Sequence, residues 1–292
     1  GMGRGAGNVK TELLLTALSE KGILKIDFNP LSKIVDDFAA MRKIYEWGTN
    51  LPYMVSGAHS LPQKDVMEWV GKRFYSFNSI IRALQNQAKG LKDNIQLDKL
   101  ELSKSNSRVL LIGGGPTVVQ HFQAIAAFLA NRKDITIVHA SSKHAKLFKD
   151  FGNKQIFCLV GNEGHRLEDA FEGKLIGEAI CVLPPFPRVM GTYIPSIIEN
   201  WAFELRKYDY TDFKMDSHTS IALQVIKELD ASAVYVVGYD GYKNETIDQK
   251  AKELLEENST LFKDFSANCS IELVSFFETE YKIPQISIYS IV

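Results

Sequence analysis

The chain has 292 residues, which is enough for two domains of roughly 100 to 200 residues each. Hydrophobic residues make up 45% of it and charged residues 24%, so each part can bury a core and the composition excludes a disordered chain. The 34 lysines and arginines nearly balance the 35 acidic residues, without blocks of like charge. This balance excludes the basic surface of a protein that binds nucleic acid or an anionic membrane, so the expected partner is a small molecule or a protein.

The cysteines and the lack of long apolar runs predict a cytoplasmic protein. Cys158, Cys181 and Cys269 are odd in number, far apart and set in apolar runs, which is typical of core residues in a reducing compartment. No run of about 18 apolar residues occurs, and the first residues do not have the pattern of a signal peptide.

Helical spacing of apolar residues dominates the first part of the chain, from Val9 to about Gln87. Asn29 before Pro30 predicts one helix start, and Leu61–Pro62 predicts another. Residues 89–106 are polar and are expected to form a linker. We therefore predict a smaller all-α domain over residues 1–100.

After the linker the pattern changes to short apolar runs separated by helix-length segments, which is typical of buried strands in a parallel sheet. The runs cover residues 109–112, 135–139, 156–160, 179–183, 233–238, 271–276 and 286–292. Helices are expected over residues 118–131, 194–205 and 217–229, and the last two runs are expected to form an antiparallel edge. Residues 101–292 are thus predicted to fold as a Rossmann-like, doubly wound α/β domain with a mostly parallel sheet.

A glycine-rich turn follows the first predicted strand and leads directly into a helix. Its residues are Gly113, Gly114, Gly115, Pro116 and Thr117. Glycines let the backbone approach a phosphate closely, and a helix start presents unpaired amides and a positive dipole end to it. The turn predicts a site for a small phosphate-bearing ligand. The alternative is a tight strand-to-helix turn that holds no ligand.

The turn does not fit the fingerprint of dinucleotide-binding proteins. Val118 stands at the third glycine position, and the second strand ends in His139, Ala140 and Ser141, where a ribose-binding acid is expected. This disfavours an NAD-dependent oxidoreductase. Motifs of zinc hydrolases and nucleophile-elbow hydrolases do not occur either.

Polar residues also follow other predicted strands, and ligands in open parallel sheets bind at the carboxyl ends of the strands. Arg188 is suited to clamp a phosphate and His139 to act as an acid or base. Asp240 or Glu163 is suited to hold a metal or accept a proton. The expected ligand-binding residues are Gly113, Gly114, Gly115, Pro116, Thr117, Ser141, Asn162, Arg188, Thr192 and Asp240.

Each of these side chains also has a purely structural interpretation. Asp240 fits a turn, Glu163 a helix start and Arg188 a surface salt bridge. Asp216, Ser217 and Thr219 are expected to cap a helix. His144 and His218 fall in predicted helices without metal-ligand spacing, so His144 is expected to be exposed or to pack.

The opening residues 3–13 resemble the last βα loop and final helix of the HMG-CoA lyase-like metal-dependent aldolases, which include 4-hydroxy-2-oxovalerate aldolase. Residues 47–57 resemble the helical region after the barrel in the same family. The resemblance implies the C-terminal portion of a carbon–carbon lyase, with the aldolase barrel as a partner in cis and Asn8 at its divalent metal cofactor. Asn8 also fits a helix N-cap. The barrel's Arg-Asp motif and His-x-His ligands have no counterpart here, so we expect the chain alone to lack aldolase activity.

The second half resembles a C-terminal extension of some bacterial aldolases of this kind. Its glycine turn, Asp216-Ser217 and Tyr239-Asp240-Gly241 are more distantly similar to the Rossmann-like domains of archaeal 6-hydroxymethylpterin pyrophosphokinases and bacterial sialyltransferases. Those proteins use ATP and a CMP-sugar, so the resemblance implies a nucleotide as the ligand or cofactor.

Three functions remain open at this point. The chain is expected to be an aldolase's accessory region with a nucleotide- or phosphate-binding α/β domain. The second function is a stand-alone transferase of a glycosyl or diphosphate group, in which Arg188 neutralises phosphate charge and Asp240 holds a metal. The third is a non-catalytic module for interaction or homo-oligomerisation.

Overall fold

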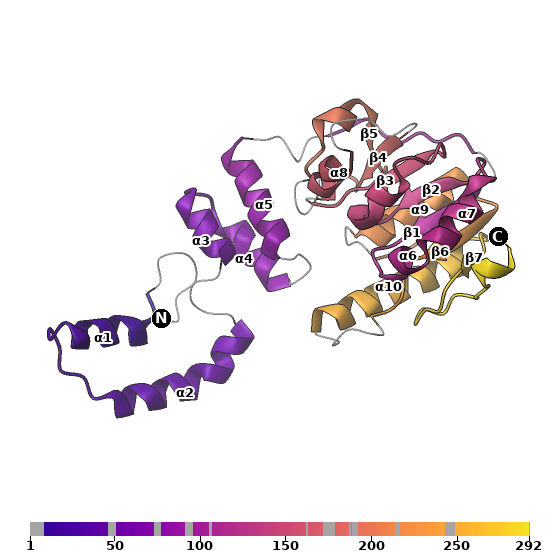
Figure 1. The fold of residues 1–292 in the computed structure, drawn as a ribbon. Helices are drawn as coiled ribbons and strands as arrows, with labels where there is room; N and C mark the ends of the chain where they lie inside the picture. The colour runs from indigo at the N-terminus through magenta and orange to yellow at the C-terminus, as the bar shows by residue number, and fades with distance from the viewer. Residues whose placement is uncertain are drawn as a thin grey trace. The chain divides into compact units, whose positions relative to one another are not determined.

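The computed structural model describes residues 9–45, 51–72, 77–90, 96–104, 107–161, 163–171, 179–186, 188, 192–213, 217–242 and 249–291. The chain divides into two compact units, Gly1–Leu91 and Lys92–Val292 (Figure 1). No helix in the described ranges is long and apolar enough to cross a membrane.

The first unit is helical. It contains α1 (Thr11–Glu20), α2 (Phe28–Tyr45), α3 (Leu51–Ala58), α4 (Gln63–Lys72) and α5 (Phe77–Ala88). Helix α3 packs against α4 and α5, and the buried side chains of these helices include Tyr53, Val66, Val70, Ile80 and Leu84. Helix α2 begins at Phe28, one residue before the predicted cap, and Asp27 Oδ1 accepts a hydrogen bond from Asn29 N–H (2.9 Å).

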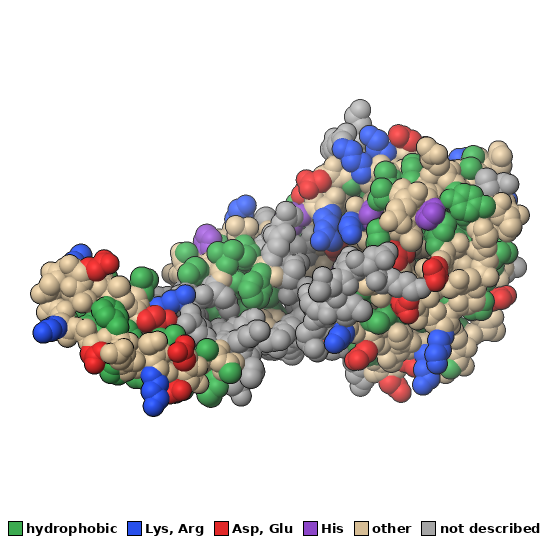
Figure 2. Space-filling model, turned by 60° about the horizontal axis from the view of Figure 1, so that its bottom comes forward, with side chains coloured by type: hydrophobic (Ala, Val, Ile, Leu, Met, Phe, Trp, Pro, Cys, Tyr) green, Lys and Arg blue, Asp and Glu red, His purple; other side chains and the backbone are tan. Residues whose placement is uncertain are grey.

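The first two helices leave apolar side chains in contact with solvent. Helix α1 has no buried residue, and hydrophobic side chains are visible on the surface of the helical unit (Figure 2). The large exposed ones from α1 and α2 include Leu13, Leu14, Phe28, Ile34, Phe38 and Met41. The predicted helical spacing is confirmed here, but the apolar stripes of these two helices are not buried.

The second unit is a seven-stranded parallel sheet with helices on both faces, which confirms the predicted Rossmann-like fold. Its strands are β1 (Arg108–Ile112), β2 (Thr136–His139), β3 (Gln155–Cys158), β4 (Ala179–Leu183), β5 (Ala202–Glu204), β6 (Ala233–Val237) and β7 (Leu273–Ser275). They lie in the order β5-β4-β3-β2-β1-β6-β7, and every neighbouring pair is parallel. The order reverses direction between β1 and β6, so the two halves of the sheet meet there.

The connections between strands cover the sheet. They are α6 (Thr117–Gln120), α7 (Phe122–Ala130), the 3₁₀ helix η1 (Ser142–Phe148), α8 (Glu163–Phe171), the 3₁₀ helix η2 (Ser196–Trp201), α9 (His218–Leu229) and α10 (Gln249–Asn268). Helix α7 packs on one face of the central strands. Alternate side chains of a strand point to opposite faces of the sheet. Helix α9 covers the other face, where it contacts β2, β3 and β4 and packs on α10.

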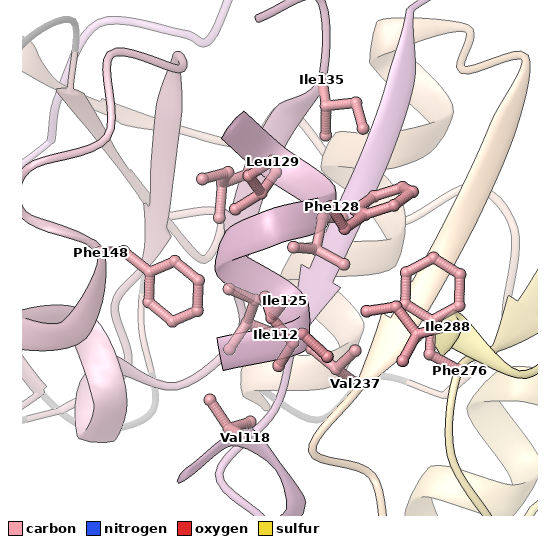
Figure 3. Packing of buried hydrophobic residues seen from close by; sticks show 13 residues of the cluster. Ile112, Val118, Ile125, Phe128, Leu129, Ile135, Phe148, Val237, Phe276 and Ile288 are labelled. Carbon is pink, nitrogen blue, oxygen red and sulfur yellow. The ribbon is translucent and has the colours of Figure 1, made fainter. Parts of the chain in front are cut away.

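A core cluster lies between α7 and the middle of the sheet (Figure 3). Phe128 from α7 meets Phe276 edge-on, with ring centroids 4.9 Å apart. Ile112, Ile125 and Phe128 are almost fully buried. Burying a side chain of this size contributes about 1.5–3 kcal/mol, so this cluster fixes β1, and with it the turn that follows β1.

Two predicted elements are wrong. Residues 286–292 do not form an antiparallel edge strand: the described part makes the 3₁₀ helix η3 (Ile288–Ser290), and Gln285 forms a parallel bridge to Ser275. The crossover helix α10 returns the chain to the start of the sheet, so β7 enters parallel to β6. The helix predicted over residues 194–205 is instead η2 followed by β5, because the apolar spacing of this segment serves a 3₁₀ turn and a short edge strand.

The predicted domain boundary at residue 100 lies nine residues beyond the observed one at Leu91. The end of the expected linker docks on the edge strand β5 through Glu204. Leu100 N–H donates to Glu204 O (2.8 Å), Glu204 N–H donates to Asp98 O (3.0 Å), and Leu97 N–H donates to the Glu204 carboxylate (3.1 Å). These bonds cover backbone groups that an edge strand would otherwise expose.

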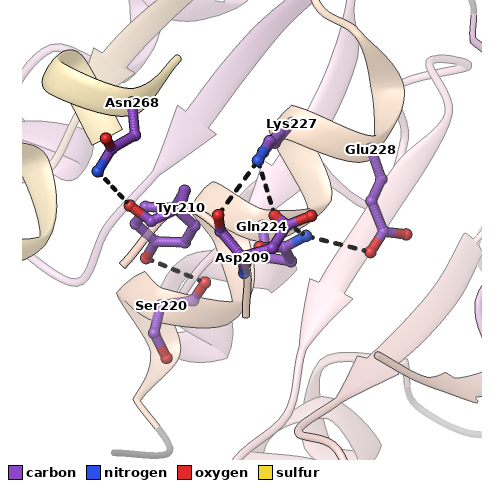
Figure 4. A network of polar contacts seen from close by, with 7 residues as sticks. All are labelled: Asp209, Tyr210, Ser220, Gln224, Lys227, Glu228 and Asn268. Atoms are coloured by element: carbon purple, nitrogen blue, oxygen red, sulfur yellow. Dashed lines mark hydrogen bonds and ion pairs between the residues drawn. The ribbon is translucent and has the colours of Figure 1, made fainter. Parts of the chain in front are cut away.

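A polar network holds the segment that leads into α9 (Figure 4). Asp209 N–H donates to Gln224 Oε1 (3.1 Å), and Lys227 Nζ donates to Asp209 Oδ1 (2.8 Å). The buried Tyr210 hydroxyl donates to Ser220 O (3.3 Å), and Asn268 Nδ2 donates to Tyr210 O (2.9 Å). The network ties this segment to α9 and α10 and so fixes where α9 begins.

Candidate functional site

The glycine turn after β1 packs against the loop after β6. Gly113 N–H donates to Val237 O (2.9 Å), and Gly115 N–H donates to Gly238 O (2.8 Å). A Cβ on Gly113 would lie 2.3 Å from Gly238 O, which no real side chain tolerates. Gly113 and Gly115 are therefore required because the turn after β1 packs closely on the loop after β6. The interpretation of the turn without a ligand predicts this packing.

Asp240 occupies the start of the helix that follows the glycine turn. Its carboxylate accepts hydrogen bonds from Thr117 N–H (3.1 Å) and from the Thr117 hydroxyl. Pro116 has no N–H, and a Cβ on Gly115 would lie 2.2 Å from Asp240 Oδ2. The protein's own carboxylate thus lies where an anion would bind the amides of α6, a helix of four residues.

Gly114 differs from its two neighbours. Its Cβ position lies 3.5 Å from Ser141 Oγ, an ordinary contact distance, and its N–H bonds to none of the residues that the structure describes. The exposed Lys143 donates from Nζ to Gly114 O (2.9 Å), and Ser141 Oγ caps η1 by accepting from Lys143 N–H (3.3 Å). Gly114, Ser141 and Lys143 therefore lie together beyond the ends of β1 and β2.

His144 also binds the glycine turn, although the sequence predicted an exposed or packing residue. Its Nε2 lies 3.2 Å from Gly114 O and 3.1 Å from Gly115 O, so this nitrogen carries a proton and donates. Burial is the largest cause that lowers the pKa of His144. The neutral ring positions the turn.

His139 lies in the core and not at the ligand edge, contrary to its predicted role as an acid or base. Its ring is fully buried and stacks on Phe157 with centroids 4.4 Å apart, while Nε2 bonds to Gln155 Oε1 (2.8 Å). Burial lowers the pKa of His139 to about 4. The side chain of this last β2 residue points into the helix layer, because alternation along the strand sets its direction.

Glu163 is the centre of a second polar cluster at this edge. Its carboxylate accepts hydrogen bonds from Ser142 N–H (3.1 Å) and from the Arg166 guanidinium, and Oε1 lies 3.6 Å from His218 Nε2. Glu163 is only 7% exposed, and a buried carboxylate needs hydrogen-bonding partners of this kind. Ser142 and Lys143 are adjacent, so η1 connects this cluster with Gly114.

Three buried polar atoms in the segments next to this cluster have no hydrogen bond to a described residue. They are Ser142 Oγ, His218 Nε2 and Thr192 Oγ1, for which the described structure offers no partner. Thr192 precedes Tyr193, whose N–H donates to Gly161 O (2.9 Å) just before α8. Buried polar groups are usually paired, so this concentration of unpaired atoms indicates a place where a ligand supplies the missing bonds.

Arg188 lies far from the glycine turn, which corrects its predicted role as a clamp for a phosphate bound there. It forms a buried ion pair with Glu204 (2.6 Å), whose strand β5 is separated from β1 by β4, β3 and β2. At ~4.8 Å between strands the two places are ~19 Å apart. The salt-bridge interpretation holds, but the pair is buried and not on the surface.

The remaining predicted positions complete the comparison with the sequence. Asn8, Asn162 and Asp216 lie outside the described residues. Ser217 caps α9 as predicted, and no group of three or more histidine, cysteine or acidic residues in the described chain is arranged to hold a metal. Sequence reasoning missed Lys143, Arg166 and His218. Only the i,i+3 spacing of Glu163 and Arg166 was visible in the sequence.

No family model matches the sequence, and no match is found among curated proteins. Among solved structures, the fold is similar to the MAf glycosyltransferase from Magnetospirillum magneticum AMB-1, with 11% identity and a TM-score of 0.47. The match covers 91% of this chain and 51% of that one, so the chain spans about half the length of its neighbour. A likeness at this level says nothing about activity.

Proposed function

We propose that the Rossmann-like unit is a nucleotide-dependent transferase whose phosphate-bearing donor binds beyond the ends of β1, β2 and β3. The observation that carries this function is the arrangement around η1. Lys143 and the N–H of Gly114, which bonds to none of the described residues, lie beyond the ends of β1 and β2. The cluster of Glu163, in which buried polar atoms lack partners among the described residues, lies beside them.

The chemistry of these groups fits a nucleotide phosphate. The Lys143 ammonium offers a positive charge on a flexible side chain, and the Gly114 amide offers a backbone donor that bonds to none of the described residues. The amides of Gly113, Gly115 and Thr117 are already bonded within the protein. The proposed phosphate position therefore lies beside the glycine turn, on its Gly114 side, and not in a loop of several amides.

A thermal-shift experiment tests the site with CMP, UDP and ATP, each with and without magnesium. One class of nucleotide is expected to raise the melting temperature of the wild type, because it binds only the folded state. Lys143→Ala and Gly114→Val are expected to remove that shift. Lys133→Ala is the matched control, since Lys133 precedes β2 at the opposite end of the strand.

Two results would contradict this function. The first is that none of the nucleotides shifts the melting temperature of the wild type. The second is a nucleotide shift that Lys143→Ala and Lys133→Ala retain equally, because the ligand would then bind elsewhere.

We also propose that the helical unit docks an aldolase barrel in cis, as the sequence resemblance implies. The supporting observation is the exposed apolar surface of α1 and α2, which includes Leu14 (47% exposed) and Phe38 (38% exposed). A separately produced HMG-CoA lyase-like barrel is expected to co-elute with the chain, and Leu14→Asp with Phe38→Asp is expected to abolish this. Failure to co-elute, or self-association of the chain through the same residues, would overturn the docking.

A further inference from the structure

His218 is held at a fixed position at the start of α9. The preceding residue, Ser217, forms a reciprocal cap: its Oγ accepts from Ser220 N–H (3.1 Å), and Ser220 Oγ accepts from Ser217 N–H (3.1 Å). The polar network of Figure 4 ties Asp209 and Tyr210 to the first turns of α9, and the Tyr210 hydroxyl donates to Ser220 O. The imidazole therefore projects from a rigid element, as a group that handles protons must.

One nitrogen of this ring faces a buried carboxylate. His218 Nε2 is buried and lies 3.6 Å from Glu163 Oε1, while 38% of the His218 side chain is exposed. Nε2 forms no hydrogen bond with the described residues, and the carboxylate beside it is that of Glu163. We therefore assign the proton of the neutral ring to Nε2, which leaves Nδ1 as the basic nitrogen. A carboxylate that orients an imidazole in this way is the arrangement that activates a hydroxyl in nucleophilic transfer.

We propose that Glu163 and His218 form a carboxylate–histidine pair in which His218 is the general base of the transfer reaction. This inference rests on the proposed transferase function. The acceptor's hydroxyl proton passes to His218 Nδ1 while its oxygen bonds to the transferred group. The bond from that group to the donor's phosphate oxygen breaks, and the nucleotide leaves with the bonding electrons. The imidazolium, paired with Glu163, then releases its proton to water.

The other histidines of this edge do not fit the role. His139 has no exposed surface, and His144 uses Nε2 to donate to the glycine turn. His165 stacks on Tyr193 with centroids 3.9 Å apart, and its carboxylate partner Glu168 also accepts from the Tyr193 hydroxyl (2.6 Å). His218 is the ring that combines an accessible surface with a buried carboxylate.

Burial keeps His218 in the neutral form that a base requires. Burial is the largest effect and lowers the pKa of His218, the charge of Glu163 opposes this change, and the charge of Arg166 adds to it. The ring is therefore neutral near pH 7 and able to accept a proton. Ser142 Oγ, the unpaired hydroxyl beside Glu163, is placed to bond the acceptor.

Nuclear magnetic resonance tests the pair without any ligand. In ¹⁵N-labelled protein, His218 is expected to be the Nε2–H tautomer, and Glu163→Gln is expected to lower its titration midpoint by about one pH unit because the stabilising charge is lost. Glu168→Gln is the matched control, since Glu168 lies on the same helix but pairs with His165. An unchanged midpoint in Glu163→Gln would overturn the pair whatever the nucleotide experiments show.

Turnover of the sugar conjugate of the nucleotide that raises the melting temperature tests the catalytic role. His218→Gln is expected to keep the nucleotide-induced thermal shift and to lower kcat by about 10²- to 10⁴-fold, with loss of the acidic limb of the pH profile. His59→Gln, in the helical unit, is expected to leave kcat unchanged. Wild-type turnover by His218→Gln would overturn the base while leaving the nucleotide site intact. If no nucleotide raises the melting temperature of the wild type, the proposed function itself is contradicted.

Discussion

Glu163 and Glu204 are two buried carboxylates on the same edge of one sheet, and their surroundings differ. Glu204 has no exposed side-chain surface, and it is paired with the equally buried Arg188, with Lys99 and with the N–H of Leu97. Glu163 is paired with an arginine that is 52% exposed and with a histidine that is 38% exposed. Glu204 is thus enclosed by its partners, whereas Glu163 is buried but has partners that reach solvent.

The difference shows why burial of a charge does not by itself mark a functional residue. At Glu204 every neighbour completes a structural link between the linker, the edge strand and the loop after β4. At Glu163 the neighbours include His218, which is partly exposed, and Ser142, whose hydroxyl bonds to none of the described residues. A ligand changes the energy of the second arrangement and not of the first.

Glu204→Gln gives the largest expected effect on this comparison. Removing the charge leaves Arg188 buried without its counterion, which typically costs about 3–5 kcal/mol of unfolding free energy. Glu163→Gln is expected to cost about 1 kcal/mol, because its cationic partner is exposed. Urea unfolding of both variants checks the contrast. Equal losses would mean that the Glu163 cluster is as structural as the Glu204 link.

The pH dependence of stability reports on the enclosed His139. Burial holds the pKa of His139 at about 4, so between about pH 6.5 and 4 the unfolded chain binds a proton that the folded state does not. The stabilising contribution is complete above pH 6.5 and is lost as the pH falls, by about 3 kcal/mol in total.

His139→Phe isolates this contribution, since phenylalanine can stack on Phe157 but cannot titrate. Urea unfolding at pH 7.5, 6, 5 and 4 measures the unfolding free energy of both proteins. As the pH falls, the wild type is expected to lose more unfolding free energy than the variant. Parallel curves for the two proteins would show that His139 is not the titrating group.

The same contrast between enclosed and accessible positions divides the glycine turn. Gly113→Ala places a Cβ against the backbone at Gly238 and is expected to cost about 2–3 kcal/mol. Gly114→Ala meets only ordinary contacts and is expected to stay within about 0.5 kcal/mol of the wild type. Thermal unfolding compares the two. A large loss of stability in Gly114→Ala would show that Gly114 lacks the free space that the proposed phosphate position needs.

Asp240→Asn has a small expected effect on stability. The amide still accepts from Thr117 N–H, so loss of the charge at the start of α6 is expected to cost about 1 kcal/mol. Because the carboxylate repels a phosphate near Gly114, the variant is expected to bind the nucleotide more tightly in calorimetric titrations. Weaker binding would show that Asp240 itself contacts the ligand or its metal, which is the role that the sequence predicts for it.

The strands illustrate how much of the fold could be predicted. β1, β2, β3, β4 and β6 each coincide with an apolar run, because a strand buried on both faces needs apolar residues in succession. β5 was missed, since this edge strand has three residues and ends in Glu204. A single polar residue in so short an element removes the pattern that predicts it.

For the candidate site, the sequence by itself determined where the polar loops begin and that they share one edge, because the periodicity of apolar residues is a local property of the chain. Only the tertiary structure decided which polar groups are already bonded. Asp240 is paired with Thr117, and His218 meets Glu163, through contacts between segments far apart in the sequence. Such pairings depend on the crossovers and the packing of helices on the sheet, which place side chains to within a hydrogen-bond length and leave no periodic pattern in the sequence.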